Sequence, residues 1–208
     1  SLFYSEQING RDVMVSNPTP RVQKFTNFQQ IHLAQKVLFK ATDDLKFDLG
    51  IQYSTTSDYP RYDRLATHDS EGVLRYAEWN YGPQNRFLLS SQFLIHPNKK
   101  WLESGSITGA YQQIKESRIQ RKFGSLDRSF REELVNVFSV NGDFSVSLTQ
   151  DKKRVLSYGF EFTYNDVISK SFGKTLVVSN GQINGSSSGF KVQSRYPDGG
   201  SNYLSSSA

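Results

Sequence analysis

The sequence predicts an all-β protein, an antiparallel meander that forms part of a large transmembrane β-barrel. Several segments alternate apolar and polar residues with the period of two that a two-faced strand requires. Short polar turns alternate along the chain with much longer polar connections, which is typical of outer-membrane barrels. The apolar fraction is only 36% while aromatic residues reach 13%. This pairing suits a thin apolar belt around a polar interior better than it suits a soluble core.

The first predicted hairpin covers residues 28–57. Its second strand, residues 45–54, alternates without a fault, and its first strand, residues 31–40, does so less regularly. A short polar turn at residues 41–44 joins the two strands. Because an odd offset would pair inside with outside, Phe39 must oppose Leu45 or Phe47.

Two further hairpins follow at about 84–114 and 135–165. The last has strict alternation on both sides of a turn at 149–153. The middle one is weaker: its turn lies at 97–100, and Trp101 is expected to open its second strand. Leu88, Leu94 and Leu102 fall on its polar face.

The remaining segments are predicted to be long extracellular loops, at about 58–83, 115–134 and 166–208. The three short turns then lie together at the opposite, periplasmic end. In this interpretation residues 1–208 are a partial β-barrel domain without a plug domain.

The alternation also predicts which side chains face lipid, because lipid cannot hydrogen-bond a side chain. We expect one set to point outward: Phe47, Leu49, Ile51, Phe144, Val146, Phe160 and Phe162. A polar set should face the lumen: Lys36, Lys46, Asp48, Asp143 and Glu161. A soluble β-sandwich also has alternating strands, but its loops are not so unequal in length and its polar faces are less consistently hydrophilic.

Composition and motifs argue against other classes of protein. The net charge of +5 comes from scattered basic residues, without a nucleic-acid-binding signature. Cysteine is absent, and the histidines His32, His68 and His96 are isolated, so no metal site is expected. No nucleophile elbow, P-loop or dinucleotide fingerprint is present. We therefore expect neither an enzyme, nor a catalytic residue, nor a cofactor.

Two stretches are more specific than any periodicity. Residues 58–65 read DYPRYDRL, and residues 74–84 read LRYAEWNYGPQ. Together they resemble the barrel of TonB-dependent receptors, especially the haem, haemoglobin and transferrin branch.

The resemblance implies a barrel of about 22 strands in the bacterial outer membrane. It implies an N-terminal plug, capture of a scarce ligand by outer loops, and import driven by the TonB complex. The ligand would be haem, an iron–siderophore or another metal complex. The partners would be outer-membrane lipid and lipopolysaccharide, the rest of the barrel with its plug, and the TonB complex. The alternatives are a receptor-like barrel that acts as a non-transporting scaffold, and a secreted β-sandwich binding protein.

The motif region supplies the candidate ligand-binding residues, since aromatic and arginine side chains dominate binding hot spots. The candidates are Tyr59, Arg61, Tyr62, Asp63, Arg64, Trp79 and Tyr81. In the alternative interpretation, Arg61 and Arg64 pair with Asp63 and Glu78 and only brace the loop.

Segment 115–131 is a second, basic candidate. Lipopolysaccharide phosphates or an anionic ligand could bind it, and a solvated loop is the simpler explanation. Its basic residues are Lys115, Arg118, Arg121, Lys122, Arg128 and Arg131, against Glu116 and Asp127.

Overall fold

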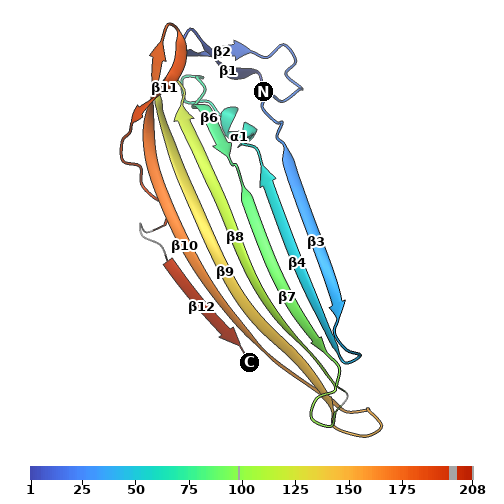
Figure 1. Cartoon of the computed structure of the whole chain (residues 1–208). Helices are drawn as coiled ribbons and strands as arrows, with labels where there is room; N and C mark the ends of the chain where they lie inside the picture. Colours follow the sequence, from blue (N-terminus) through green and yellow to red (C-terminus); the bar gives the residue numbers. More distant parts are fainter. Residues whose placement is uncertain (98, 197–200, 208) are drawn as a thin grey trace.

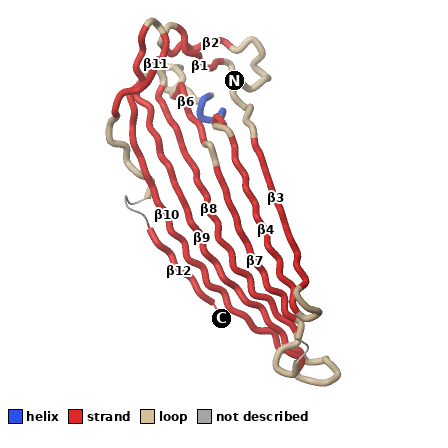
Figure 2. Tube along the Cα trace, in the orientation of Figure 1, coloured by secondary structure: helices blue, strands red, loops and turns tan. Residues whose placement is uncertain are grey.

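The chain folds into one strongly curled antiparallel sheet, a half-barrel of seven strands (Figure 1). The computed structural model describes residues 1–97, 99–196 and 201–207. The seven strands lie in the order β11-β10-β9-β8-β7-β4-β3. Figure 2 shows strands almost throughout and a single short helix, α1 (Tyr62–Leu65). No helix in these described residues is long and apolar enough to cross a membrane. The predicted all-β antiparallel meander is confirmed.

The elements differ greatly in length, and the longest strands lie next to one another in the sheet. Strands β5 and β6 pair with each other, β6 also pairs with β8, β12 pairs with β10, and β1 and β2 form a separate two-stranded sheet. The strands are β1 (Phe3–Ile8), β2 (Arg11–Ser16), β3 (Gln30–Lys40), β4 (Leu45–Thr56), β5 (Tyr59–Pro60), β6 (Tyr76–Tyr81), β7 (Asn85–Ile95), β8 (Ser104–Lys122), β9 (Asp127–Ser147), β10 (Val155–Ser179), β11 (Gln182–Ser188) and β12 (Ser201–Ser207).

The three predicted hairpins are present as β3–β4, β7–β8 and β9–β10. Phe39 pairs with Phe47, one of the two partners that face matching allowed. The turns at 41–44, at 96–97 with 99–103, and at 148–154 lie together at one end of the sheet (Figures 1 and 2). Part of the predicted middle turn, Asn98, lies outside the described residues. Trp101 belongs to this turn and not to a strand, because β8 begins at Ser104.

Two of the predicted loops are largely wrong. Most of segment 115–134 is strand, since β8 runs to Lys122 and β9 begins at Asp127. Segment 166–208 begins as strand too, because β10 continues to Ser179. In these two segments the strands continue to pair beyond the part of the sheet that has an apolar face. The sequence therefore shows no hydrophobic alternation that would indicate a strand. Segment 58–83 is a connection with short elements of its own: β5, α1 and β6.

Two hairpins that the periodicity did not predict turn on Asn-Gly pairs. In β1–β2, Asn9 and Gly10 have φ values of 51° and 74°. In β10–β11, Asn180 and Gly181 have φ values of 53° and 73°. Positive φ at both central residues is the type I′ geometry, which matches the twist of the flanking strands and favours Asn-Gly. Both turns lie at the upper end in Figure 1, opposite the three short turns.

The register places apolar and polar side chains on opposite faces of the sheet. Residues paired directly across neighbouring strands share a face, and one such row runs through Leu49, Val140 and Phe162. We call eight of the exposed apolar side chains of this face, all on β4, β7, β9 and β10, the apolar belt; each of the eight has 39–47% of its surface exposed. The belt comprises Leu49, Ile51, Leu89, Phe93, Phe138, Val140, Phe160 and Phe162.

The adjacent row belongs to the other face and is polar, from Asp48 through Asn141 to Glu161. The side chains of Lys36 and Asp48 form an ion pair on this face, with 2.7 Å between Nζ and Oδ2. The predicted division of the side chains between two faces is therefore confirmed. No second sheet within the described residues packs on the apolar belt, as a soluble β-sandwich would require.

Candidate functional site

The motif segment 58–83 is attached to the sheet by backbone pairing at its upper end. Strand β6 extends the sheet beside β8, where Trp79 pairs with Gln120 and Tyr81 pairs with Arg118. The N–H of Arg61 donates to the carbonyl of Trp79 at 2.8 Å. These contacts place β5 and the start of α1 against β6, and they bring the two motifs together.

Arginine and aromatic side chains from both motifs stack on one another. The guanidinium of Arg61 lies 4.7 Å from the ring centre of Trp79 and 5.5 Å from that of Tyr81. Its Nη1 also donates to the Tyr81 hydroxyl at 3.0 Å. Arg118 of β8 lies 5.5 Å from the Tyr81 ring, and Tyr59 lies 5.4 Å from it. Cation–π contacts of this kind orient a guanidinium without neutralising its charge.

One half of the predicted brace is correct. Arg61 binds both carboxylate oxygens of Asp63, and this hydrogen-bonded pairing holds the pKa of Asp63 below its ordinary value. Glu78 does not pair with Arg61 or Arg64. It accepts from Arg121 and Arg128 instead, on the face that carries the apolar belt.

Strand alternation divides the basic residues of segment 115–131 between the two faces. Arg118, Lys122 and Arg131 share the polar face with Trp79 and Tyr81. The face of the apolar belt takes the other three, Lys115, Arg121 and Arg128. What the sequence presents as one basic loop is therefore two separate basic groups on a β-hairpin.

Arg118 and Arg131 of the polar-face group line a cavity of about 390 Å³, which we call the arginine pocket. Part of its wall comes from the segment after β11, where the carbonyl of Gln193 accepts from Nε of Arg131 at 3.2 Å. Four arginines line the pocket, and none of the described lining residues is acidic. The lining consists of Arg61, Trp79, Tyr81, Arg118, Gln120, Arg131, Gln193, Ser194 and Arg195.

The predicted candidates have different positions relative to this pocket. Arg61, Trp79 and Tyr81 line it. Asp63 does not line the pocket, but its carboxylate accepts a hydrogen bond from Arg61. Tyr59 lies behind Tyr81, where burial and then the charge of Glu116 raise the pKa of its hydroxyl. Tyr62 and Arg64 are exposed on α1 and do not line the pocket.

Several pocket residues were not among the candidates. From the sequence, Arg118 and Arg131 are recognisable only as members of a basic segment. In the structure Arg118 shares a strand face with Gln120, two residues along β8, and Arg131 shares it with Ser129, two residues along β9. Gln193, Ser194 and Arg195 come from a segment without a pattern, so no sequence signal indicated them.

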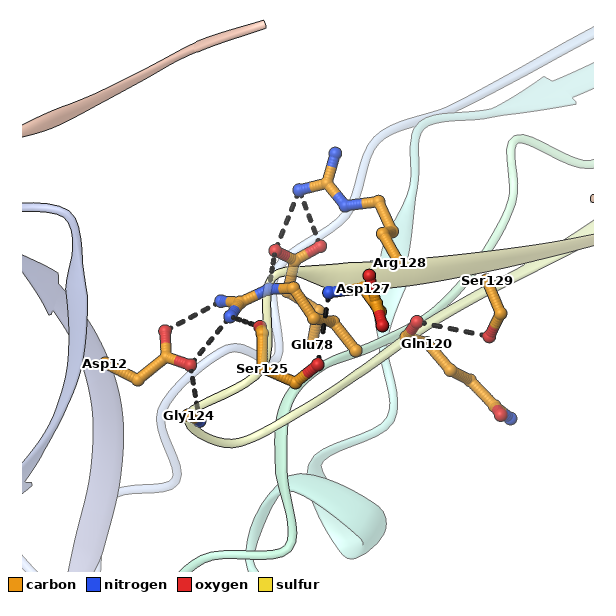
Figure 3. Close-up of polar contacts among 9 residues, drawn as sticks. Asp12, Glu78, Gln120, Gly124, Ser125, Asp127, Arg128 and Ser129 are labelled. Carbon is orange, nitrogen blue, oxygen red and sulfur yellow. Dashed lines mark hydrogen bonds and ion pairs between the residues drawn. The ribbon is translucent and has the colours of Figure 1, made fainter. Parts of the chain in front are cut away.

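A second polar cluster, on the face of the apolar belt, connects the β1–β2 hairpin to the main sheet (Figure 3). Arg121 donates two hydrogen bonds to the carboxylate of Asp12, at 2.6 and 2.8 Å. Its Nε donates to Glu78 at 2.7 Å, and Glu78 also accepts from Arg128 at 2.7 Å. The N–H of Gly124 completes the site by donating to Asp12 at 2.8 Å.

The two central side chains of this cluster are withdrawn from water: 4% of Arg121 and 2% of Asp12 is exposed. Burial alone would lower the pKa of Arg121, but the hydrogen bonds that it donates to Asp12 and Glu78 outweigh burial and leave that pKa raised. Because Asp12, Glu78 and the carbonyl of Ser125 accept the hydrogen bonds of Arg121, this cluster is a structural connection between the hairpin and the main sheet.

Groups of three or more potential metal ligands of the histidine or carboxylate kind are absent from the described part of the chain.

Comparisons with protein-family models, with curated proteins and with solved structures find no match to this chain. The likeness of residues 58–65 and 74–84 to TonB-dependent receptors stays a prediction from motifs. The function is therefore argued below from the sheet and from the arginine pocket.

Proposed function

We propose that this chain is part of the barrel of a TonB-dependent receptor in the bacterial outer membrane, which imports a scarce ligand such as haem, an iron–siderophore or another metal complex. The observation that carries the proposal is a sheet with one exposed apolar face and one polar face. In water such a face would exceed what a soluble monomer exposes. In a membrane the apolar face contacts lipid and the polar face lines the lumen.

The height of the apolar belt supports this proposal. On β4 the apolar side chains of this face occupy alternate positions from Leu45 to Tyr53. A transmembrane β-strand needs roughly 9–11 residues to cross the hydrocarbon core, and this span has that length. Strands β8, β9 and β10 have 19, 21 and 25 residues, so they would extend well beyond the membrane.

Aromatic and polar rows at the upper edge of the belt also support a membrane boundary. Tyr111 and Phe138 are in contact there, with ring centres 4.8 Å apart. In the next row up, Gln113 donates to Asn136 at 3.1 Å, and Asn136 lies beside Asp166. Aromatic girdles followed by polar residues are typical of the interface between lipid and water.

Exposed lysines lie on the same face above this boundary, at Lys115, Lys170 and Lys174. Lipopolysaccharide phosphates are the anions available at that level of an outer membrane, and ammonium groups bind phosphates well. The other partners that we propose are the rest of the barrel with its plug, and the TonB complex.

Import is favoured over a purely scaffolding role by the arginine pocket. Its residues Trp79 and Tyr81 belong to β6, which lies at the upper end of the sheet in Figure 1, and in a barrel this end of the polar face is the mouth of the lumen. A scaffold has no need of four arginines around a cavity at that position.

The intact protein should support TonB-dependent uptake in a Gram-negative host. Cells starved of iron and supplied with haem or a ferric siderophore should grow only when both the protein and a functional TonB system are present. Recovery of the protein in the outer-membrane fraction is the first measurement, and growth with and without TonB is the second. Outer-membrane localisation without TonB-dependent growth on any of these iron sources would support the scaffold instead.

Leu49→Arg should impair barrel assembly, while Asp48→Asn should have little effect. Arginine at mid-membrane on the lipid face costs about 2–4 kcal/mol, and substitutions in the lumen cost far less. Asp48 loses only its contact with Lys36, which is itself 73% exposed. Folded barrels migrate differently on gels before and after heating, and this shift gives the folded fraction. Equal loss in the two variants would contradict a lipid-facing Leu49.

A further inference from the structure

We infer that a row of oxygen-bearing side chains on the polar face of the sheet binds a calcium ion. The row, which we call the carboxylate row, runs across β8, β9 and β10 and consists of Glu116, Glu133 and Ser169. It lies next to the row of Arg118 and Arg131 and outside the arginine pocket. The proposed function makes no use of this site, and the test of the site does not depend on transport.

The carboxylate of Glu133 is the first argument, because it is buried without a partner. Only 7% of Glu133 is exposed, and neither of its side-chain oxygens has a hydrogen-bond partner among the described residues. Buried carboxylates normally have hydrogen bonds or a counter-charge, because moving a bare charge out of water is very unfavourable. A cation bound at Glu133 would supply the missing counter-charge.

The two side chains beside Glu133 strengthen this argument. Residues paired directly across an antiparallel sheet have Cβ atoms about 4.5–5.5 Å apart, so Glu116 and Ser169 flank Glu133 on the same face. Glu116 brings a second negative charge, and like charges directly opposite each other are destabilising. The hydroxyl of Ser169 is also buried and without a partner in the described structure, and only 2% of this residue is exposed. This second unpartnered oxygen comes from a different strand and lies at the same position beside Glu133.

The neighbouring arginines do not neutralise the carboxylate row by direct contact. The guanidinium of Arg118 lies over an aromatic ring of β6, and Arg131 donates to uncharged oxygens of two glutamines. Neither arginine forms an ion pair with Glu116 or Glu133 within the described structure. Their charges therefore act only at longer range, where they weaken the attraction for a cation without occupying the carboxylate oxygens.

The row on the other side of the carboxylate row is apolar and reduces its contact with water. It consists of Ile114, Val135 and Val167. On the β7 side, Gln84 donates to Glu116 at 3.1 Å and orients its carboxylate. Because electrostatic attraction is stronger where water is excluded, a cation should bind this row more tightly than an exposed pair of carboxylates.

The ligand atoms of the row favour calcium over other cations. Calcium takes about 6–8 oxygen ligands in flexible geometry, and a carboxylate can bind it through one oxygen or through both. Two carboxylates and a hydroxyl supply several of these oxygens, and water supplies the others. Magnesium requires a nearly ideal octahedral shell and loses its water reluctantly, so it should bind more weakly. The row has no nitrogen or sulfur ligand of the kind that zinc prefers.

Calorimetric titration of the intact protein in detergent micelles tests this inference, with calcium chloride as the probe after a chelator has removed divalent ions. Calcium should bind and should raise the midpoint of thermal unfolding, because a ligand that binds only the folded state stabilises it. Magnesium chloride should bind at least about tenfold more weakly. Equal affinity for the two ions would overturn the assignment to calcium, and no binding of calcium would overturn the site.

Glu133→Gln should weaken calcium binding by about tenfold or more and remove the calcium-dependent rise in the unfolding midpoint. Without calcium the same variant should unfold at a higher temperature than the unaltered protein, because a neutral amide relieves the repulsion from Glu116. This reversal of sign distinguishes a cation site from a carboxylate with a purely structural role. Ser169→Ala should weaken binding by a smaller factor, because it removes a neutral ligand.

Glu132→Gln is the matched control, because Glu132 is the adjacent carboxylate on β9 and lies on the opposite face. It should leave the calcium affinity unchanged. Equal loss in the Glu132→Gln and Glu133→Gln variants, or unchanged affinity in a folded Glu133→Gln variant, would overturn the proposal. So would an unfolding midpoint that calcium does not move but acid raises in the unaltered protein and not in Glu133→Gln, since the two carboxylates would then share a proton.

Discussion

Expressed alone and without detergent, residues 1–208 are expected to associate into large particles and not to form a monomer. The apolar belt leaves side chains such as Leu49 and Phe162 about two-fifths exposed, and soluble monomers rarely expose contiguous apolar patches beyond a few hundred Å². The sheet also has an open edge at β3, all of whose side chains are exposed. Each unpaired N–H and C=O on such an edge is a site for pairing with another chain.

Size-exclusion chromatography with light scattering measures this outcome, with and without detergent micelles. Detergent should convert part of the aggregated material into smaller particles, because it covers the apolar belt. A sharp monomer peak in plain buffer, together with cooperative thermal unfolding, would contradict the lipid-facing interpretation of the belt and the barrel proposal with it.

Arg121→Ala should destabilise the upper end of the intact protein by about 3–5 kcal/mol, the usual effect of removing one partner from a buried ion pair. The substitution would leave Asp12, only 2% exposed, without its two guanidinium hydrogen bonds. Arg121→Lys should not restore the loss, because an ammonium cannot replace the bidentate geometry or reach Glu78 at the same time. The β1–β2 hairpin is then expected to detach from the sheet.

Limited proteolysis within residues 1–16 measures the detachment of the β1–β2 hairpin. Denaturant unfolding in detergent measures the loss of stability. Lys122→Ala is the matched control, since the neighbouring side chain is exposed and such surface changes stay within about 0.5 kcal/mol. The double variant Asp12→Ala, Arg121→Ala should lose less stability than the sum of the two single variants, because the first change already removes the shared interaction. Strict additivity would show that the pair is not coupled.

Hairpins with one apolar face were predictable because burial or lipid contact imposes a period of two on the sequence. The alternation at residues 45–54 identified β4, and face matching reduced the partners of Phe39 to two, of which Phe47 is the one observed. The Asn-Gly pairs at residues 9–10 and 180–181 are a further local signal for two hairpins, one that depends on turn conformation and not on alternation.

Beyond the apolar belt the period disappears, because neither face of the strand is selected for apolar residues there. Residues 115–122 and 127–134 therefore read as a polar loop although they form paired strands. For the same reason the basic residues of this segment could be recognised but could not be assigned to faces. The register of β8 against β9 separates Arg118 from Arg121 and gives them different roles.

The all-β class, the three hairpins and the side chains that share each strand face can be predicted from residue order alone, because they depend on local alternation. The roles of the polar strand ends depend on long-range contacts that exist only in the folded chain. Arg121 meets Asp12 across 109 positions of the chain, and Gln193 completes the wall around Arg131. Such pairings arise when a curled sheet brings segments that are distant in the sequence to the same end of the sheet. The residues around each partner form no local pattern from which the other partner could be predicted.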